Sequence, residues 1–140
     1  MLAPLDARAK IFSVLRSATR TLDVYAQTLT DAQTLAILKE KAAAGVTVRV
    51  VLGSVDVVKD NVALMEKLRG WGVASAAPKK PYVHAKAAVA DGSFAYVGSA
   101  NFTANSMDRN REVGLLLSQA GAQTIAAAFA RDWAASGGAK

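Results

Sequence analysis

The segment VHAKAAVADGSFAYVGSAN, residues 83–101, predicts a β-hairpin. Its two strands are expected at 84–90 and 94–98, where small and β-branched residues predominate. Asp91 and Gly92 lie between them, and Asp-Gly between two apolar runs is among the strongest short hairpin signals.

One face of the expected hairpin is polar. If the loop pairs Ala90 with Ser93, His84 lies opposite Ser99, and Lys86 and Asn101 share that face, because side chains two residues apart in a strand point the same way. An imidazole, an ammonium, a hydroxyl and a carboxamide would then lie together. The other face is apolar and is expected to be core, with Val83, Ala85, Ala87, Val89, Phe94 and Tyr96.

The flanking sequence predicts a single α/β domain over residues 1–140. Helices are expected at 7–18, 31–44, 57–69 and 120–135. Further strands are expected at 21–27, 46–52, 73–76 and 112–117. Alternating helices and strands favour parallel pairing, whereas the hairpin adds antiparallel strands, so we expect a mixed β-sheet flanked by helices on both faces. Residues 136–140 are expected to form a loose tail.

The composition restricts the chemistry. The 140 residues include no Cys and one His, which excludes thiolate metal sites, disulfides, Cys nucleophiles and any two-histidine site within one copy. The formal net charge of +6 favours partners that carry phosphate, such as nucleic acid or anionic lipid. We expect no transmembrane segment and no signal peptide, because no apolar run approaches ~20 residues and the N-terminus is charged. A chain without Cys suits any redox environment, so the sequence does not assign the protein to a cellular compartment.

The polar face suits attack on phosphorus. Neutral imidazole is a good nucleophile near neutral pH, so His84 is the candidate nucleophile. Lys86, Ser99 and Asn101 are candidates to hold the non-bridging oxygens, where each donor is typically worth ~3 kcal/mol in the transition state. Glu112, at the start of the strand expected at 112–117, is the candidate carboxylate that fixes the tautomer of His84.

These residues resemble the HKD signature of the phospholipase D superfamily. The pattern His84-x-Lys86, Asp91, Gly98-Ser99-x-Asn101 matches that signature at all six positions and in its spacing, and NREVG at 110–114 resembles the segment that follows it. The resemblance implies a phospholipase D-like fold and a two-step phosphodiester exchange that uses no metal and no other cofactor. One His attacks phosphorus and forms a phosphohistidine, and a second His protonates the leaving alcohol and then activates water or another alcohol.

The resemblance also implies a role for each matched residue. The matched catalytic positions are His84, Lys86, Asp91 and Glu112. The matched phosphate-binding positions are Lys86, Ser99 and Asn101. In the family the role of the motif Asp is more structural or orienting than direct, and Asp91 here also begins the hairpin turn.

The number of motifs differs from that of typical lipid-acting members, which carry two in one chain. Family members with one motif pair as homodimers, with the active site across the two-fold axis. Since this chain has only His84, the chemistry requires that a second copy supply the second histidine.

Three functions stay open at this stage. Segment 98–112 most resembles the second half of bacterial cardiolipin-synthase-like members, which favours hydrolysis or phosphatidyl transfer on phospholipid, with peripheral contact to a membrane, and a bacterial source. The alternative is a metal-independent homodimeric endonuclease of the same superfamily, because a basic chain suits DNA or RNA. The third is an inactive or binding-only half of a tandem enzyme.

Overall fold

Helices and strands alternate through the N-terminal half of the chain, as the apolar periodicity predicts. The computed structural model describes residues 1–137. Its first elements are β1 (Leu2–Ala3), α1 (Ala7–Ser17), β2 (Thr21–Ala26), α2 (Ala32–Ala43), β3 (Thr47–Leu52), α3 (Asn61–Gly70) and β4 (Ala74–Ala76). Strands β2, β3 and β4 pair in parallel, and the apolar run of β3 is buried at its end.

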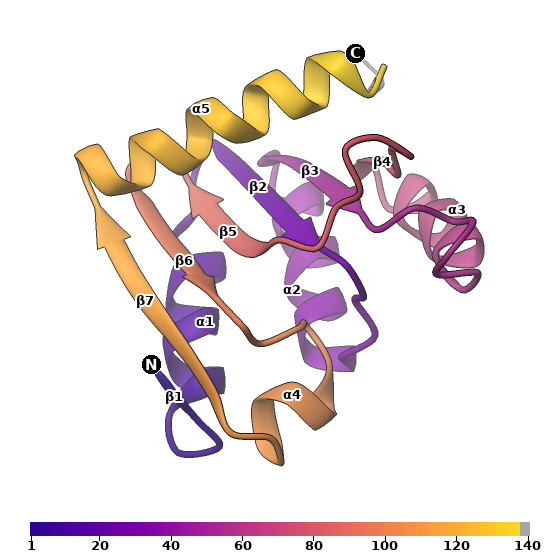
Figure 1. Cartoon of the computed structure of the whole chain (residues 1–140). Coiled ribbons are helices and arrows are strands. Elements are labelled where there is room, and N and C mark those ends of the chain that lie inside the picture. The colour runs from indigo at the N-terminus through magenta and orange to yellow at the C-terminus, as the bar shows by residue number, and fades with distance from the viewer. Residues whose placement is uncertain (138–140) are drawn as a thin grey trace.

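The C-terminal half adds antiparallel strands to the same sheet (Figure 1). Its elements are β5 (Lys86–Ala90), β6 (Phe94–Gly98), α4 (Ala104–Asp108), β7 (Glu112–Ser118) and α5 (Ala120–Ala135). The strand order is β1-β7-β6-β5-β2-β3-β4, and β5 pairs antiparallel with β2. The expected mixed sheet is confirmed.

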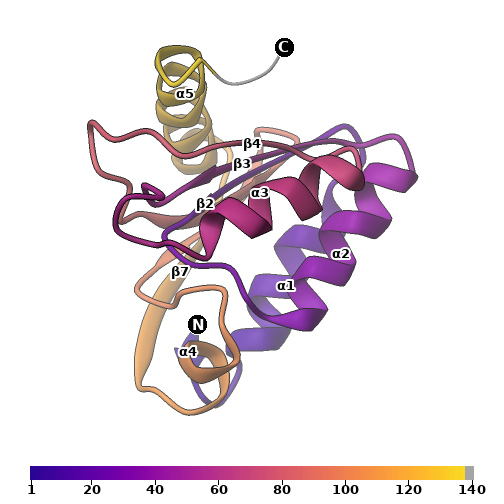
Figure 2. The ribbon, with the colours of Figure 1, turned by 90° about the vertical axis from the view of Figure 1, so that its right-hand side faces the viewer.

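Helices lie on both faces of this sheet, as expected. Figure 2 shows α5 on one side and α1, α2 and α3 on the other. The larger core cluster fills the side of α1 and α2, and includes Ile11, Leu15 and Leu38. A smaller one under α5 contains Phe129 and Trp133, whose rings are stacked with centroids 6.0 Å apart.

The boundaries of some elements differ from the expected ones. The helix expected at 57–69 begins at Asn61, because the backbone N–H groups of Val57 and Val58 donate to Ser54 in a preceding turn. Strand β1 and helix α4 were not expected, since elements of two and five residues are too short to show periodicity. A loose tail was expected at 136–140, and residues 138–140 of it lie outside the described residues.

The register of the hairpin also differs from the expected one. Ala90 pairs with Phe94 rather than with Ser93, so the turn has three residues, and both Asp91 (φ 53°) and Gly92 (φ 67°) are left-handed. One extra turn residue exchanges the two faces of the second strand. Tyr96 therefore lies opposite Ala88, and both faces of the hairpin contribute to the core. The pairing of His84 with Ser99 was wrong, since β5 begins only at Lys86.

Candidate active site

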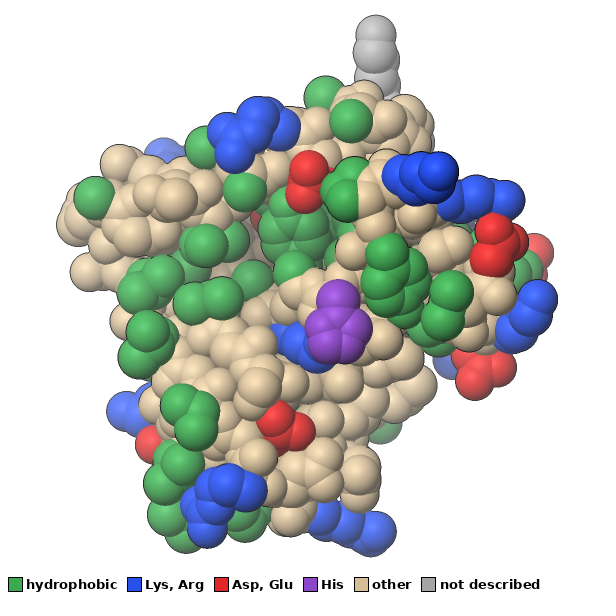
Figure 3. Space-filling view, viewed as in Figure 1, with side chains coloured by type: hydrophobic (Ala, Val, Ile, Leu, Met, Phe, Trp, Pro, Cys, Tyr) green, Lys and Arg blue, Asp and Glu red, His purple; other side chains and the backbone are tan. Residues whose placement is uncertain are grey.

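Most of the polar residues expected at the site lie at one end of β5, β6 and β7. His84 lies in the segment that enters β5, two residues before Lys86, the first residue of that strand. Ser99 follows β6, and Glu112 begins β7. Figure 3 shows the imidazole of His84, the single histidine, exposed near the middle of this face. The candidate nucleophile is thus open to a ligand.

Lys86 is the buried cation of the site. It is 7% exposed, and its Nζ donates to the backbone carbonyl of His84 at 2.7 Å and to Oε1 of Gln27 at 3.2 Å. The same Nζ lies 3.1 Å and 3.3 Å from the two ring nitrogens of His84. Burial lowers the pKa of Lys86, while the charge of Glu112 opposes that shift. The ammonium is therefore fixed beside the imidazole by acceptors on both sides.

Ser99 and Glu112 form a hydrogen-bonded pair across the ends of β6 and β7. Oγ of Ser99 donates to Oε2 of Glu112 at 2.5 Å and accepts from the backbone N–H of Val113 at 3.1 Å. Nδ2 of Asn110 donates to the other carboxylate oxygen at 3.2 Å. Within the described part of one chain, Glu112 thus contacts Ser99 and Asn110, and no hydrogen bond joins it to His84 as the sequence had suggested.

The close approach of β6 and β7 depends on two glycines. A Cβ on Gly98 would lie 2.7 Å from both Cα of Gly114 and the carbonyl oxygen of Val113. Such a contact is shorter than van der Waals packing allows, so any side chain here would separate the strands that carry Ser99 and Glu112. The group that approaches Gly98 closely is thus the backbone of β7.

Asn101 lies in the loop between β6 and α4. That loop is anchored because the backbone N–H groups of Thr30 and Asp31 both donate to the carbonyl of Phe102 at 3.0 Å. Oδ1 of Asn101 is buried and has no hydrogen-bond partner among the described residues. The loop that carries Asn101 is therefore held in place, and the unused group is an acceptor, whereas a phosphate oxygen would need the donor Nδ2.

Asp91 is the one expected catalytic residue that the fold keeps apart from the others. It lies beyond the opposite end of β5, where its carboxylate accepts hydrogen bonds from the backbone N–H groups of Thr19, Arg20 and Thr21 at 2.7–3.2 Å. Burial would raise the pKa of Asp91, but these bonds outweigh it and lower the pKa to about 2. These bonds support a structural role in which Asp91 fixes the turn between α1 and β2, the orienting role that the resemblance also implies.

Substitution Asp91→Asn is expected to cost about 1–2 kcal/mol of stability at pH 7, and to leave kcat unchanged in the folded protein. Asn tolerates the left-handed backbone, so the variant removes mainly the charge. Because the folded pKa is depressed, the stabilisation is present above pH ~4 and is lost as the pH falls through about 2. Urea unfolding at several pH values should show the two curves converging in acid. Unchanged stability with lost activity would return Asp91 to the catalytic set.

Sequence reasoning missed Gln27, which follows β2. Oε1 of Gln27 accepts from Lys86, and its Nε2 donates to the hydroxyl of Tyr82 at 3.2 Å. The side chain of Asn61, only 2% exposed, donates to the backbone carbonyls of Gln27 and Gly53 at 3.1 and 2.8 Å. The available signal was a polar residue at the carboxyl end of a buried strand, where ligands bind in α/β sheets.

No helix within residues 1–137 is long and apolar enough to cross a membrane. In that same part of the chain, His, Asp and Glu side chains do not gather in threes as a metal site would require.

Comparison with known proteins places the chain in a family. A family model described as "Cardiolipin synthase, PLD-like domain" matches residues 11–133, so the chain belongs to this phospholipase D-like domain family. The superfamily resemblance of the sequence is thereby confirmed. No curated protein matches the chain at a significant level.

Solved structures share the fold. Nuc from Salmonella typhimurium, a phospholipase D family member, has 22% identity and a TM-score of 0.82, with 99% of this chain and 93% of that chain covered. NucT from Helicobacter pylori has 17% identity and a TM-score of 0.81, with 97% and 94% covered. Phosphatidylserine synthase from Haemophilus influenzae Rd KW20 has 12% identity and a TM-score of 0.62, with 84% and 33% covered. The phospholipase D-like fold is confirmed.

Proposed function

We propose that this chain is a phospholipase D-type phosphodiesterase that acts on phospholipid, by hydrolysis or phosphatidyl transfer, through a phosphohistidine at His84. The observation that carries the proposal is the buried ammonium of Lys86, held 3.1 Å from a ring nitrogen of the exposed His84. An exposed nucleophile beside a fixed cation is the arrangement that attack on a phosphodiester needs, because negative charge grows on the phosphoryl oxygens.

In the first step, a ring nitrogen of His84 bonds to phosphorus as the bond from phosphorus to the leaving alcohol oxygen breaks. Lys86 and Nδ2 of Asn101 donate to the non-bridging oxygens, together with the hydroxyl of Ser99 once it turns from Glu112 to the phosphate. A second imidazole donates a proton to the leaving oxygen. In the second step, that imidazole takes a proton from water or another alcohol, whose oxygen displaces His84 from phosphorus.

The second imidazole requires a homodimer. One side chain cannot lie both at the nucleophile side and at the leaving-group side of the same phosphorus, and the chain contains a single histidine. A two-fold axis that brings two copies of His84 to opposite sides of one phosphate supplies both. Each homodimer would thus form one composite active site from its two chains.

A nucleic-acid phosphodiester is the second candidate substrate. The formal net charge of +6 per chain favours it, since cationic proteins attract the phosphate backbone. A homodimer would carry +12, twice the charge of one chain. An inactive or binding-only half of a tandem enzyme is the third candidate.

The purified protein, assayed side by side on phosphatidylglycerol vesicles and on plasmid DNA, is expected to turn over the lipid with EDTA present. The expectation rests on the lack of clustered acidic and histidine ligands within residues 1–137. Loss of turnover in EDTA, with recovery in Mg²⁺, would contradict the phosphohistidine route. Cleavage of DNA alone would select the nuclease, and no turnover of either substrate would favour the inactive half.

Substitution Gln27→Leu is expected to lower kcat/KM about tenfold, because it removes an acceptor that orients the ammonium of Lys86. Losing an acceptor also destabilises the charged form, so the alkaline limb of the pH profile should move to lower pH. That limb should already lie below 10.5, the ordinary pKa of a lysine, since burial lowers the pKa of Lys86. Gln27→Glu should move the limb the other way.

The matched control is Gln123→Leu, at an exposed position of α5. It should leave the rate and the pH profile as they are. If Gln27→Leu lowered the rate with no movement of the alkaline limb, Gln27 would have only a packing role.

A further inference from the structure

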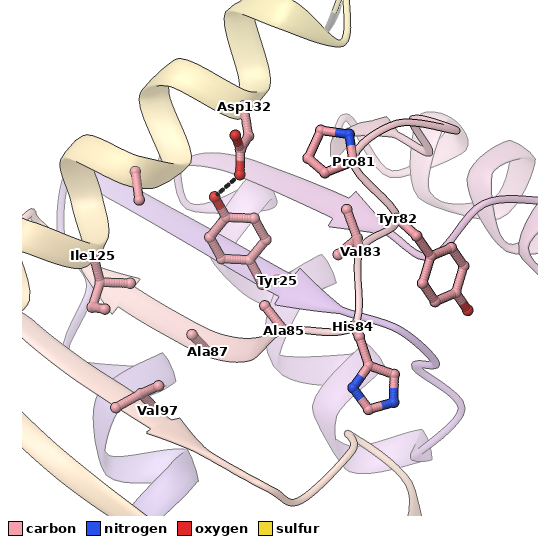
Figure 4. A pocket seen from close by; sticks show the side chains of 11 residues that line it. Tyr25, Pro81, Tyr82, Val83, His84, Ala85, Ala87, Val97, Ile125 and Asp132 are labelled. Atoms are coloured by element: carbon pink, nitrogen blue, oxygen red, sulfur yellow. Dashed lines mark hydrogen bonds between the residues drawn. The ribbon is translucent and has the colours of Figure 1, made fainter.

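A cavity of about 280 Å³ opens directly beside His84, on the face of the sheet that α5 covers. It lies between α5 and the segment 81–85, above the start of β5 and the end of β6 (Figure 4). Its walls are mainly aliphatic, with Val83, Ala87, Val97, Ile125 and Ala128 among the lining residues. We call this cavity the apolar groove. His84 is one of the residues at its edge, with the ring directed away from the groove (Figure 4), so a group next to a phosphate bound at His84 can reach the groove.

The side chains around the groove offer little to a polar ligand. The two polar groups at the end away from His84, the hydroxyl of Tyr25 and the carboxylate of Asp132, are hydrogen-bonded to each other at 2.5 Å. The edge of a nucleobase carries donors and acceptors that aliphatic walls would leave unpaired, at a cost in free energy. A hydrocarbon chain has no such groups, so the chemistry of the walls favours it.

The order of charges along the groove points the same way. At one end lies His84, whose ring contacts the ammonium of Lys86, a residue that does not itself line the groove, whereas the other end carries the carboxylate of Asp132. A nucleic-acid strand in the groove would bring a second phosphate toward that carboxylate, since every nucleotide has one. A phospholipid has a single phosphodiester, and its acyl chains are uncharged.

We propose that the apolar groove binds an acyl chain of the phospholipid whose phosphate is attacked at His84. The inference rests on the proposed function and extends it, because it assigns the groove as the element that distinguishes a lipid from other phosphodiesters. The groove begins at the nucleophile, so it takes the part of the chain nearest the glycerol.

The test is a series of short-chain phosphatidylglycerols, kept below their micelle concentrations, with glycerophosphoglycerol as the member without chains. We expect kcat/KM to rise about fourfold for each added methylene that the groove covers, and then to level off. Ala128→Trp, which fills the groove from α5, should flatten the series. Ala128→Leu, which fills less, should bring the plateau to a shorter chain.

The matched control is Ala127→Trp, one residue earlier on α5, where the side chain is exposed and does not line the groove. It should preserve the whole series. Thermal melts of the variants show whether each remains folded. Binding of the same lipids to the His84→Ala protein, measured by calorimetry, provides a readout that needs no turnover and should show the same dependence on chain length.

The outcomes separate the two proposals. Turnover of phosphodiesters with no dependence on chain length, in either rate or binding, would overturn the groove and keep the proposed function. Chain-dependent binding without turnover would keep the groove and overturn the proposed function. Loss of dimer mass in Ala128→Trp would show that a second copy covers the groove, and loss of DNA cleavage alone would show that a base occupies it. Either result would overturn the acyl-chain assignment.

Discussion

Replacing His84 with Ala is expected to reduce turnover by at least about four orders of magnitude, the scale seen when an enzyme loses its nucleophile. The protein should remain folded, because the imidazole is exposed and lies outside the core clusters. The bond from Lys86 to the backbone carbonyl of residue 84 does not depend on the imidazole, so the ammonium should keep its place. The measurement is a single-turnover assay, with a thermal melt of the same sample.

Gln123→Leu provides the matched control, since it changes an exposed side chain on α5 that is distant from His84 in the sequence. A radiolabelled phosphoryl group should be trapped on wild-type protein in reactions quenched with alkaline denaturant, in which a phosphohistidine is stable, and not on the His84→Ala variant. Near-normal turnover without His84 would exclude this residue as the nucleophile and, with it, the proposed site.

Activity is also expected to depend on a second chain. If each composite site needs His84 from two copies, dimers of wild-type protein with the His84→Ala variant should be inactive. Random exchange at equal amounts would then leave about one quarter of the dimers with both histidines. The two proteins are unfolded together and refolded, and their activity is measured. It is divided by the activity of the same total amount of wild-type protein refolded alone.

An independent-site protein behaves differently in the same experiment. Half of the activity would remain at equal amounts, because each wild-type chain would act alone. Full specific activity from a species that stays at 14.6 kDa, the mass of one chain, would likewise contradict the composite site. Mixing with the Gln123→Leu protein should cause no loss.

The hairpin illustrates what the sequence could and could not predict. Asp91 and Gly92 located the turn, and the apolar runs on either side located both strands. Whether the turn held two or three residues depends on backbone torsions at Asp91 and Gly92 that the residue types do not determine uniquely. That one residue decides which face Tyr96 occupies, so the strands were predicted correctly and their facing was not.

In the candidate site too, contacts between residues close in the sequence were predictable, and contacts that depend on strand pairing were not. His84 and Lys86 are two residues apart, so their proximity follows from local sequence, and the structure brings them together. The contact of Gln27 with Lys86 follows from the pairing of β2 with β5, which spacing in the sequence does not specify. Asp91 matched a motif by spacing, yet it lies at the other end of β5, because a strand separates its two ends in space.

The pairing of β2 with β5 also has a consequence for the order of folding. The hairpin of β5 and β6 closes over a three-residue turn, so its contacts are local and can form early. The hydrogen bond from Lys86 to Gln27 joins residues 59 apart, and closing a loop of that length has an entropic cost that only later tertiary contacts offset. We therefore expect the hairpin that forms first to contain His84 and Lys86 with the ammonium of Lys86 still mobile. Catalytic activity should be gained only in the later, slower step in which β5 pairs with β2.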